Sequence, residues 1–337
     1  MITATLVAIV IAALFFDFTN GQHDASAAIG PVVSTGVLPV RPAILLCSAF
    51  NFIAFLVYGL HVAGSVGNGL VMASAVTPVV ILSALLSAIA WNTLTLRFGI
   101  PSSSSHALVG SLVGATFAYA GGNAVIWHGL LPIVLAIVIS PMLGMVFSII
   151  MALIFGSLLH KVHVTTISKH ANWLQIVSCA FMSMAHGGND AQKTMGIIYL
   201  SLITQGILAP HSAIPMWVVI SCQLAMALGT LCGGKAILHT MGSGITRLRP
   251  WQGVTAQVSA STVLSLATSM GVPVSSTHTI TGALAGVGSL RAISAVRWKL
   301  LTRVFASWLI TLPASACFAG IIMLILKVIL SAVNEVH

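Results

Sequence analysis

The sequence has very little acidic charge. Only four of its 337 residues are acidic, and charged residues make up 5% of the chain, whereas a soluble protein carries about 25%. Because 58% of the residues are hydrophobic, this shortage excludes a soluble domain and predicts an integral membrane protein. The net charge of +9 then indicates basic cytoplasmic loops and not a nucleic-acid partner. The acidic residues are Asp17, Asp24, Asp190 and Glu335.

Cysteine is also sparse, and its placement does not point to a metal or redox centre. The five cysteines are scattered through apolar runs without a CxxC pair, which predicts small buried side chains and no disulfide. No acid is placed to complete a catalytic triad with Ser and His, and no cluster has metal-ligand spacing. We therefore expect neither an enzyme nor a bound cofactor.

Long apolar runs, by contrast, are abundant. A spanning helix needs about 20 apolar residues, so the runs predict an all-α polytopic membrane protein. The first and sixth runs continue into polar, glycine-bearing segments, where we expect the helices to be broken. The ten candidate spans are 2–18, 43–62, 69–93, 101–120, 129–157, 172–206, 214–235, 251–270, 273–290 and 304–328.

Two motifs occur twice, in the same order. Residues 20–25 (NGQHDA) align with 186–191 (HGGNDA) at a lag of 166 residues. Residues 99–114 (GIPSSSSHALVGSLVG) align with 271–286 (GVPVSSTHTITGALAG) at a lag of 172 residues. Two motifs at nearly one lag predict two homologous halves of about five spans each.

An odd number of spans per half means that the second half enters the membrane upside down. Basic side chains test this independently, because they favour cytoplasmic loops. Placing the basic loops inside puts both termini outside, with Gly99 turning inside and Gly271 outside. The basic residues lie near 41, 97, 158–170, 235–250 and 291–303, whereas the loops near 63–68, 121–128 and 207–213 have none.

These observations divide the chain into three parts. Residues 1–157 form the first transmembrane repeat, 158–171 a basic cytoplasmic linker, and 172–330 the second, inverted repeat. We expect the broken helices and helix hairpins of the two repeats to meet at a site near the midplane of the membrane.

The duplicated acidic motif predicts a cation or proton site. An ionised carboxylate in the bilayer costs at least about 2.5–3.5 kcal/mol, so a repeated one is expected to have a function. Asp24 and Asp190 each follow a glycine and precede small residues, where an unwound backbone offers carbonyl ligands. Asp17 has Ser183 as its repeat mate, and we interpret it as structural or interfacial.

The duplicated serine motif predicts two helix N-termini that bind an anion. Pro101 and Pro273 suit a first helical turn, and the hydroxyl residues after them suit N-caps. Such N-termini offer unpaired N–H groups and a partial positive charge. His106 and His278 are secondary candidates, with buried core histidines as the alternative. The predicted phosphate ligands are Ser103, Ser104, Ser105, Ser275, Ser276 and Thr277, together with the two aspartates.

The carboxylates also indicate which anion is bound. A carboxylate repels a fully ionised oxyanion but accepts a hydrogen bond from an anion that keeps a proton. Phosphate near neutral pH keeps an O–H group and sulfate does not, so the residues favour phosphate. Lys193 is the basic side chain within a motif, and it is a secondary candidate together with Asn20.

These motifs resemble the bacterial inorganic phosphate transporter (PiT) family, in its low-affinity permease branch. The resemblance rests on NGQHDA, SMAHGGNDAQKTMGII, PSSSSHALVG and PVSSTHTITGALAGVG, and it extends over residues 15–325. It implies uptake of inorganic phosphate across the plasma (inner) membrane, driven by H⁺ or Na⁺, with sites between the halves. Ala27 departs from the family pattern, which commonly has Asn there.

The coupling ion is predicted to be H⁺. His23 adjoins Asp24, and a histidine titrates close to working pH. Na⁺ prefers hard oxygen ligands, by analogy with other hard cations, and His23 and Ala27 remove two of them. A Na⁺ site at Asn189 and Asp190 stays open as the alternative, so His23, Asp24, Asn189 and Asp190 are the coupling candidates.

A sulfate permease of the same fold is the main alternative to phosphate symport. A passive anion channel is a second one, which needs no paired carboxylates. The expected partners are inorganic phosphate, free or as a metal–phosphate complex, and the lipid bilayer. The sequence leaves a homodimer open.

Overall fold

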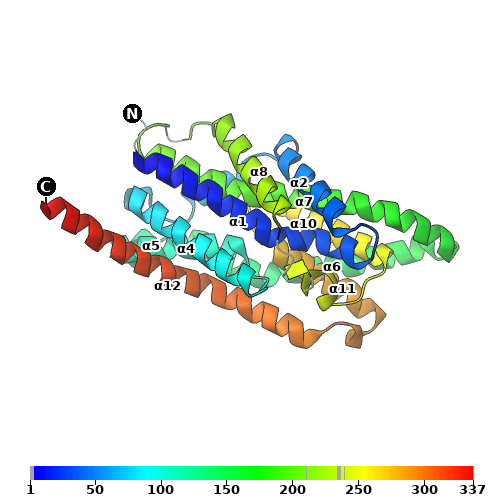
Figure 1. The fold of residues 1–337 in the computed structure, drawn as a ribbon. Coiled ribbons are helices and arrows are strands. Elements are labelled where there is room, and N and C mark those ends of the chain that lie inside the picture. The colour runs from blue at the N-terminus through cyan, green and yellow to red at the C-terminus, as the bar shows by residue number, and fades with distance from the viewer. Residues whose placement is uncertain (1–3, 210, 234–236, 239, 337) are drawn as a thin grey trace.

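The computed structural model describes residues 4–209, 211–233, 237, 238 and 240–336, which form a bundle of long helices (Figure 1). The first half contains α1 (Ala4–Ser34), α2 (Val40–Ile53), α3 (His61–Asn68), α4 (Pro78–Arg97), α5 (Ser104–Ala120) and α6 (Trp127–Leu159). The second half contains α7 (Val164–Thr204), α8 (Met216–Leu231), α10 (Pro250–Ser269), α11 (Ser276–Arg291) and α12 (Trp298–Val336). Short helical turns join them: η1 (Ala54–Leu56), η2 (Ala73–Ala75), η3 (Gly122–Ala124), η4 (Thr240–Gly244) and η5 (Ile293–Ala295).

The outer surface of the bundle is apolar. Four helices within the described residues are long and apolar enough to cross a membrane: α1, α4, α6 and Trp298–Ile329 of α12. On α6, the side chains of Leu131, Leu135 and Ile139 are exposed, whereas Ser140 and Ser148 are buried. Apolar side chains outside and polar ones inside suit a lipid environment, which confirms the all-α membrane fold.

The expected breaks at the acidic motifs are wrong. Helices α1 and α7 run without interruption through Gly21 and Gly187. The glycines serve close packing instead: a Cβ on Gly21 would lie 2.2 Å from the carbonyl oxygen of Met226 in α8. A Cβ on Gly187 would lie 2.7 Å from the carbonyl oxygen of Asn51 in α2. Small residues in these helices therefore let another helix backbone approach.

The packing keeps its pattern when the halves are exchanged. Helix α1 packs against α4 and α8, and α7 packs against α10 and α2. In the same way α5 packs against α12, and α11 packs against α6. Helices α1 and α7 also contact each other, so the two motif-bearing helices meet.

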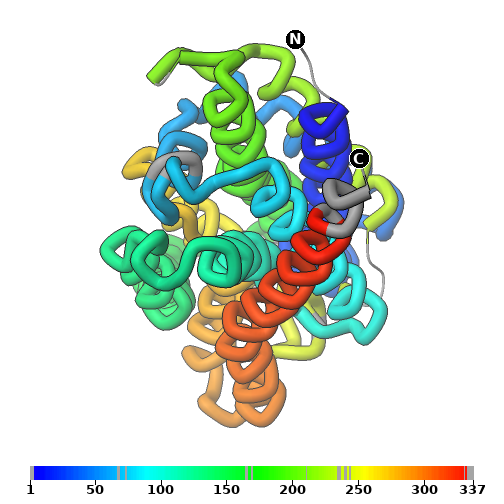
Figure 2. The backbone as a smooth tube through the Cα atoms, turned by 90° about the vertical axis from the view of Figure 1, so that its left-hand side faces the viewer, coloured from blue at the N-terminus to red at the C-terminus, as the bar shows by residue number. Residues whose placement is uncertain are grey.

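Helices α1 and α7 run in opposite directions (Figure 1). The Thr35 Oγ1 donates to Gln175 Oε1 at 2.9 Å, and the Cys179 Sγ donates to the Ala28 carbonyl at 3.6 Å. Residue numbers thus rise along α1 as they fall along α7. The start of α1 and the end of α12 lie at one end of the bundle (Figures 1 and 2). The α1–α2, α6–α7 and α11–α12 connections lie at the other end.

Two helix hairpins, α4–α5 and α10–α11, bring the serine motifs to the middle of the bundle. Each hairpin turns at a glycine with positive φ, 64° at Gly99 and 71° at Gly271, a conformation that glycine adopts readily. The helices that follow begin at Ser104 and Ser276, three residues after the prolines, and hydroxyl residues cap them as expected. Ser103 Oγ accepts from the N–H of His106 at 3.3 Å, and Ser275 Oγ accepts from the N–H of His278 at 3.4 Å.

Candidate functional site

Asp24 lies on α1 and is buried among residues of both halves. Its Oδ2 accepts a hydrogen bond from Ser104 Oγ of the first half at 2.8 Å. Its Oδ1 accepts one from Thr277 Oγ1 of the second half at 2.9 Å and lies 3.0 Å from His23 Nδ1. The carboxylate therefore joins the tips of both hairpins to α1.

Asp190 has the equivalent position on α7 and a similar set of partners. Its Oδ2 accepts from Ser276 Oγ at 2.8 Å and lies 2.7 Å from His186 Nδ1. Its Oδ1 accepts from the Nζ of Lys193, one turn further along the helix. The ammonium also donates to Ser105 Oγ at 2.5 Å. Lys193 thus links the second half to the first hairpin.

The flanking candidates surround the two carboxylates. Ser104 Oγ also lies 2.6 Å from Asn20 Oδ1, so its single O–H is shared between Asn20 and Asp24. His23 Nε2 lies 3.3 Å from both Thr95 Oγ1 and Ser102 Oγ, so both of its ring nitrogens have partners. These contacts place His23 and Asn20 in one network with Asp24.

Asn189 is the repeat mate of His23 and is buried. Its Nδ2 donates to Thr268 Oγ1 at 2.8 Å. Its Oδ1 has no hydrogen-bond partner among the described residues. A buried, unpartnered oxygen is costly unless something binds it.

Four predicted residues have other partners than the carboxylates. Ser103 and Ser275 use their hydroxyl oxygens to cap α5 and α11. His106 and His278 pack ring to ring with centroids 4.8 Å apart, and His278 stacks on Trp308 with centroids 3.7 Å apart. The ring nitrogens of both histidines have no hydrogen-bond partner among the described residues.

Sequence reasoning missed His186 as a site residue. It lies 166 residues after Asn20, so the motif alignment itself pairs it with a predicted candidate. Asp17, interpreted from the sequence as structural or interfacial, is fully buried.

The buried charges do not balance. Within the described residues, three carboxylates are buried, those of Asp17, Asp24 and Asp190, but only one ammonium, that of Lys193. Removing carboxylates from water is expensive unless a positive charge or a proton compensates them. The site therefore suits a bound cation or proton, while its hydroxyl groups can donate to an anion.

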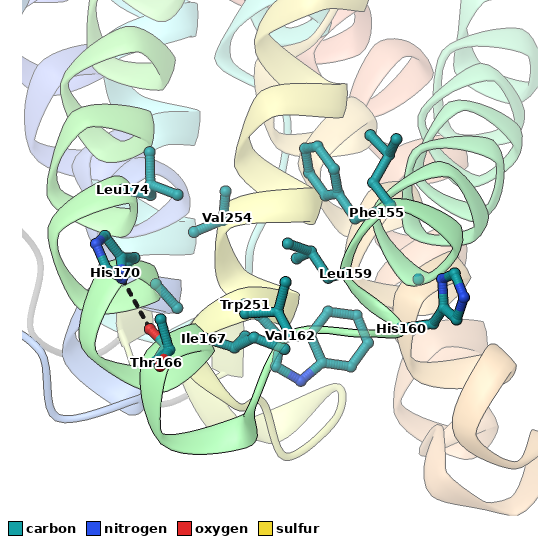
Figure 3. A pocket seen from close by; sticks show the side chains of 13 residues that line it. Phe155, Leu159, His160, Val162, Thr166, Ile167, His170, Leu174, Trp251 and Val254 are labelled. Atoms are coloured by element: carbon teal, nitrogen blue, oxygen red, sulfur yellow. Dashed lines mark hydrogen bonds between the residues drawn. The ribbon is translucent and has the colours of Figure 1, made fainter.

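A cavity of about 500 Å³ near the α6–α7 connection has a different character (Figure 3). Its lining is mainly apolar and includes Phe155, Leu159 and Val254. Its polar contacts include that between His170 Nδ1 and the Thr166 carbonyl at 2.9 Å. The candidate carboxylates and hairpin serines are not among the lining residues, so this cavity is separate from the site.

A helical membrane protein with repeated buried carboxylates and opposed hairpins has the architecture of a membrane transporter. Residues 20–319 match the profile of the Phosphate transporter family, so the chain belongs to this family and is not an enzyme. This confirms the resemblance found in the motifs.

Two relatives and one solved structure are similar over nearly the whole chain. A probable low-affinity inorganic phosphate transporter of Rhizobium meliloti is 50% identical over 316 residues, covering 94% of this chain and 95% of the relative. One of Bacillus subtilis with the same name is 40% identical over 323 residues, covering 95% and 97%. A structure titled "The sodium-dependent phosphate transporter" aligns with a TM-score of 0.89 at 24% identity, over 97% of this chain and 100% of that one.

Proposed function

We propose that the protein imports inorganic phosphate across the plasma membrane by H⁺ symport and alternating access. The observation that carries this proposal is a matched pair of contacts. Ser104 donates to Asp24 and Ser276 donates to Asp190, each at 2.8 Å and each from the tip of a hairpin. Hydroxyl groups that donate to a carboxylate can turn to donate to a phosphate oxygen. The names of the relatives support the same substrate.

The carboxylates favour phosphate over sulfate. A phosphate bound beside Asp24 or Asp190 can donate its O–H to the carboxylate, and sulfate near neutral pH has no such proton. A site that hydrogen-bonds a substrate O–H discriminates strongly against an analogue that lacks it, because its buried acceptor is then left unpaired. We therefore expect sulfate to compete weakly.

Asp24 and His23 are the proposed proton site. The Nδ1 of His23 lies 3.0 Å from Asp24 Oδ1, so the two side chains can share one proton. The second candidate ion is Na⁺ at Asn189 and Asp190, which the unpartnered Oδ1 of Asn189 supports. Replacement of His23 by Asn is expected to shift the pH profile of uptake if H⁺ is the coupling ion.

Alternating access requires contacts between the halves that can break. Thr277 of the second half donates to Asp24 of the first at 2.9 Å. Lys193 of the second half donates to Ser105 of the first at 2.5 Å. Exchange of these contacts for contacts with phosphate and the coupling ion is the proposed trigger for movement between the halves.

The halves 1–157 and 172–330 are proposed to be inverted repeats joined by the linker 158–171, with both termini outside. The opposed directions of α1 and α7 support this. Cysteines placed at Ser34, the last residue of α1, and at Ala209, after α7, test it. The chain used lacks Cys232 and Cys317, which are exposed and not buried as the sequence predicted. Labelling of position 34 from the cytoplasm and of 209 from outside is expected. Labelling of both from one face would refute inversion.

Uptake of radiolabelled phosphate into proteoliposomes tests the function. We expect an inward H⁺ gradient to drive phosphate uptake without Na⁺. A protonophore should abolish this uptake, and excess sulfate should inhibit it only slightly. Empty liposomes and liposomes with Asp24→Asn are the controls. A passive channel would keep its flux in Asp24→Asn, and uptake that requires Na⁺ and ignores pH would overturn H⁺ coupling.

Two finer proposals concern the substrate form and the assembly. Phosphate is proposed to travel as the free anion, and comparison of uptake with and without Mg²⁺ tests a metal–phosphate complex instead. A homodimer is proposed as the assembled form. Cross-linking in native membranes tests it, and a chain that stays monomeric at every cross-linker concentration would contradict it.

A further inference from the structure

Lys193 lies in a cage of three oxygens. Its Nζ contacts a carboxylate oxygen, Asp190 Oδ1, a hydroxyl oxygen, Ser105 Oγ, at 2.5 Å, and a main-chain carbonyl oxygen, that of Val274, at 2.8 Å. The side chain is 3% exposed, so the ammonium is removed from solvent. An ammonium has three N–H donors, and each one here has an oxygen acceptor.

The repeat alignment predicts an equivalent oxygen set around Asp24, without an ammonium. The repeat lags pair Asp190 with Asp24, Ser105 with Thr277, and the Val274 carbonyl with that of Ser102. They pair Lys193 with Ala27, which has no charge. In this half the hydroxyl reaches the carboxylate directly, because Thr277 Oγ1 donates to Asp24 Oδ1 at 2.9 Å.

The oxygen types in the cage are those that hard monovalent cations use. Carboxylate, hydroxyl and carbonyl oxygens are hard ligands, and none of the three contacts is to nitrogen or sulfur. A lysine ammonium is a compact point charge of the same sign and valence as Na⁺. It can therefore compensate the buried carboxylate as a bound ion would.

We propose that the Lys193 ammonium is a tethered cation that permanently fills the second-half ion site. The equivalent set around Asp24 is then left for the mobile coupling ion. This inference rests on the proposed function, because it presupposes a cation-coupled transporter. It also explains why one half has a charged side chain where the other has Ala27.

A purely structural ion pair is the competing explanation. Lys193 and Asp190 are three residues apart on one helix, a spacing at which oppositely charged side chains commonly interact. In that case removal of the lysine destabilises the protein, and added Na⁺ does not restore it. If the lysine occupies an ion site, its removal uncovers a site that Na⁺ can fill.

The test is Na⁺ binding to purified, phosphate-free protein in choline chloride at constant ionic strength. Wild type, Lys193→Ala and Lys193→Gln are titrated with Na⁺ while the melting temperature and bound radioactive Na⁺ are followed. We expect each variant to bind about one more Na⁺ per chain than wild type, with a saturable rise in melting temperature.

Two controls make the result specific. Lys161→Ala removes an exposed lysine and should behave as wild type. The double variant Asp190→Asn with Lys193→Met removes ligand and ammonium together, and it should gain no Na⁺ site. Lys193→Gln keeps a side chain of similar length, so it decides the question if Lys193→Ala does not fold.

Na⁺ binding that is equal in wild type and in the folded Lys193 variants would overturn the inference. Recovery of Lys193→Ala only when Na⁺ is present during purification would support it. Neither readout involves phosphate or transport. Failure of the proposed function, which is absence of phosphate uptake by wild type, is therefore measured separately.

Discussion

The two halves of the molecule use one scaffold and balance its charge in different ways. In the first half, Asp24 is held by hydroxyl groups and the neighbouring His23. In the second half, Asp190 has a hydroxyl, His186 and a full positive charge on Lys193. In the proposed arrangement, duplication fixes the positions of the ligands, and single substitutions such as Lys193 for Ala27 decide which half can exchange an ion with solvent.

The two halves should differ most in how much stability each loses when its aspartate is replaced. Asp190→Asn leaves the Lys193 ammonium without its bonded carboxylate, and such a loss costs about 3–5 kcal/mol of unfolding free energy. No lysine or arginine is bonded to Asp24. Asp24→Asn therefore leaves only unsatisfied hydrogen-bond donors, and we expect a loss of about 1–3 kcal/mol in unfolding free energy. Both should abolish coupled uptake. Thermal unfolding and proteoliposome uptake measure the two effects.

Adding Lys193→Met to Asp190→Asn should recover most of the lost stability, because no unpaired charge remains. Adding Lys193→Met to Asp24→Asn should recover no stability, because Lys193 is bonded to Asp190 and not to Asp24. Equal losses of stability in the two single variants would show that the second half has no special charge balance.

Replacement of the crossing glycines should affect the halves alike. Gly21→Ala and Gly187→Ala each place a Cβ within 2.7 Å of a carbonyl oxygen, so overpacking should cost about 1–3 kcal/mol in either half. Gly156→Ala on α6 is the matched control, because no atom lies within 4 Å of its Cβ. Melting temperatures check this, and an unchanged value for both variants would contradict the close packing.

The capping serines should give the smallest effects. Ser103→Ala and Ser275→Ala each remove one N-cap, at a cost of about 0.5–2 kcal/mol in stability. The sequence predicted these residues as phosphate ligands, whereas the structure uses their oxygens within their own helices. Phosphate affinity measured on both variants distinguishes the roles, and a tenfold loss at unchanged stability would support the ligand role.

Much of the site could be predicted from repetition alone. The aligned motifs identified Asp24, Asp190 and the hairpin residues Ser104 and Ser276, and the structure brings each aspartate to its own serine. The hydroxyl caps of α5 and α11 were also predictable, because serine is a favoured N-cap. The expected place of Pro101 and Pro273 in the first turn is wrong, since each proline lies two residues before its capping serine.

The remaining features depend on packing between distant segments. The sequence predicted helix breaks at Gly21 and Gly187. It could not predict their packing role, because a sequence does not show which helix backbone will approach a glycine. The bond from Thr277 to Asp24 joins residues 253 positions apart and crosses the halves, so no local pattern signals it. His186 had a signal in the alignment with Asn20, but the change of residue type concealed it.

The central claim is that the hydroxyl groups at the hairpin tips bind phosphate beside the carboxylates. Equilibrium binding of radiolabelled phosphate to purified protein tests it most directly, on wild type, Ser104→Ala with Ser276→Ala, and the control Ser289→Ala. Each hydrogen bond to a charged group contributes about 1.5–3 kcal/mol, so the double variant should bind at least tenfold more weakly while the control binds as wild type. Wild-type affinity in a folded double variant would contradict the account.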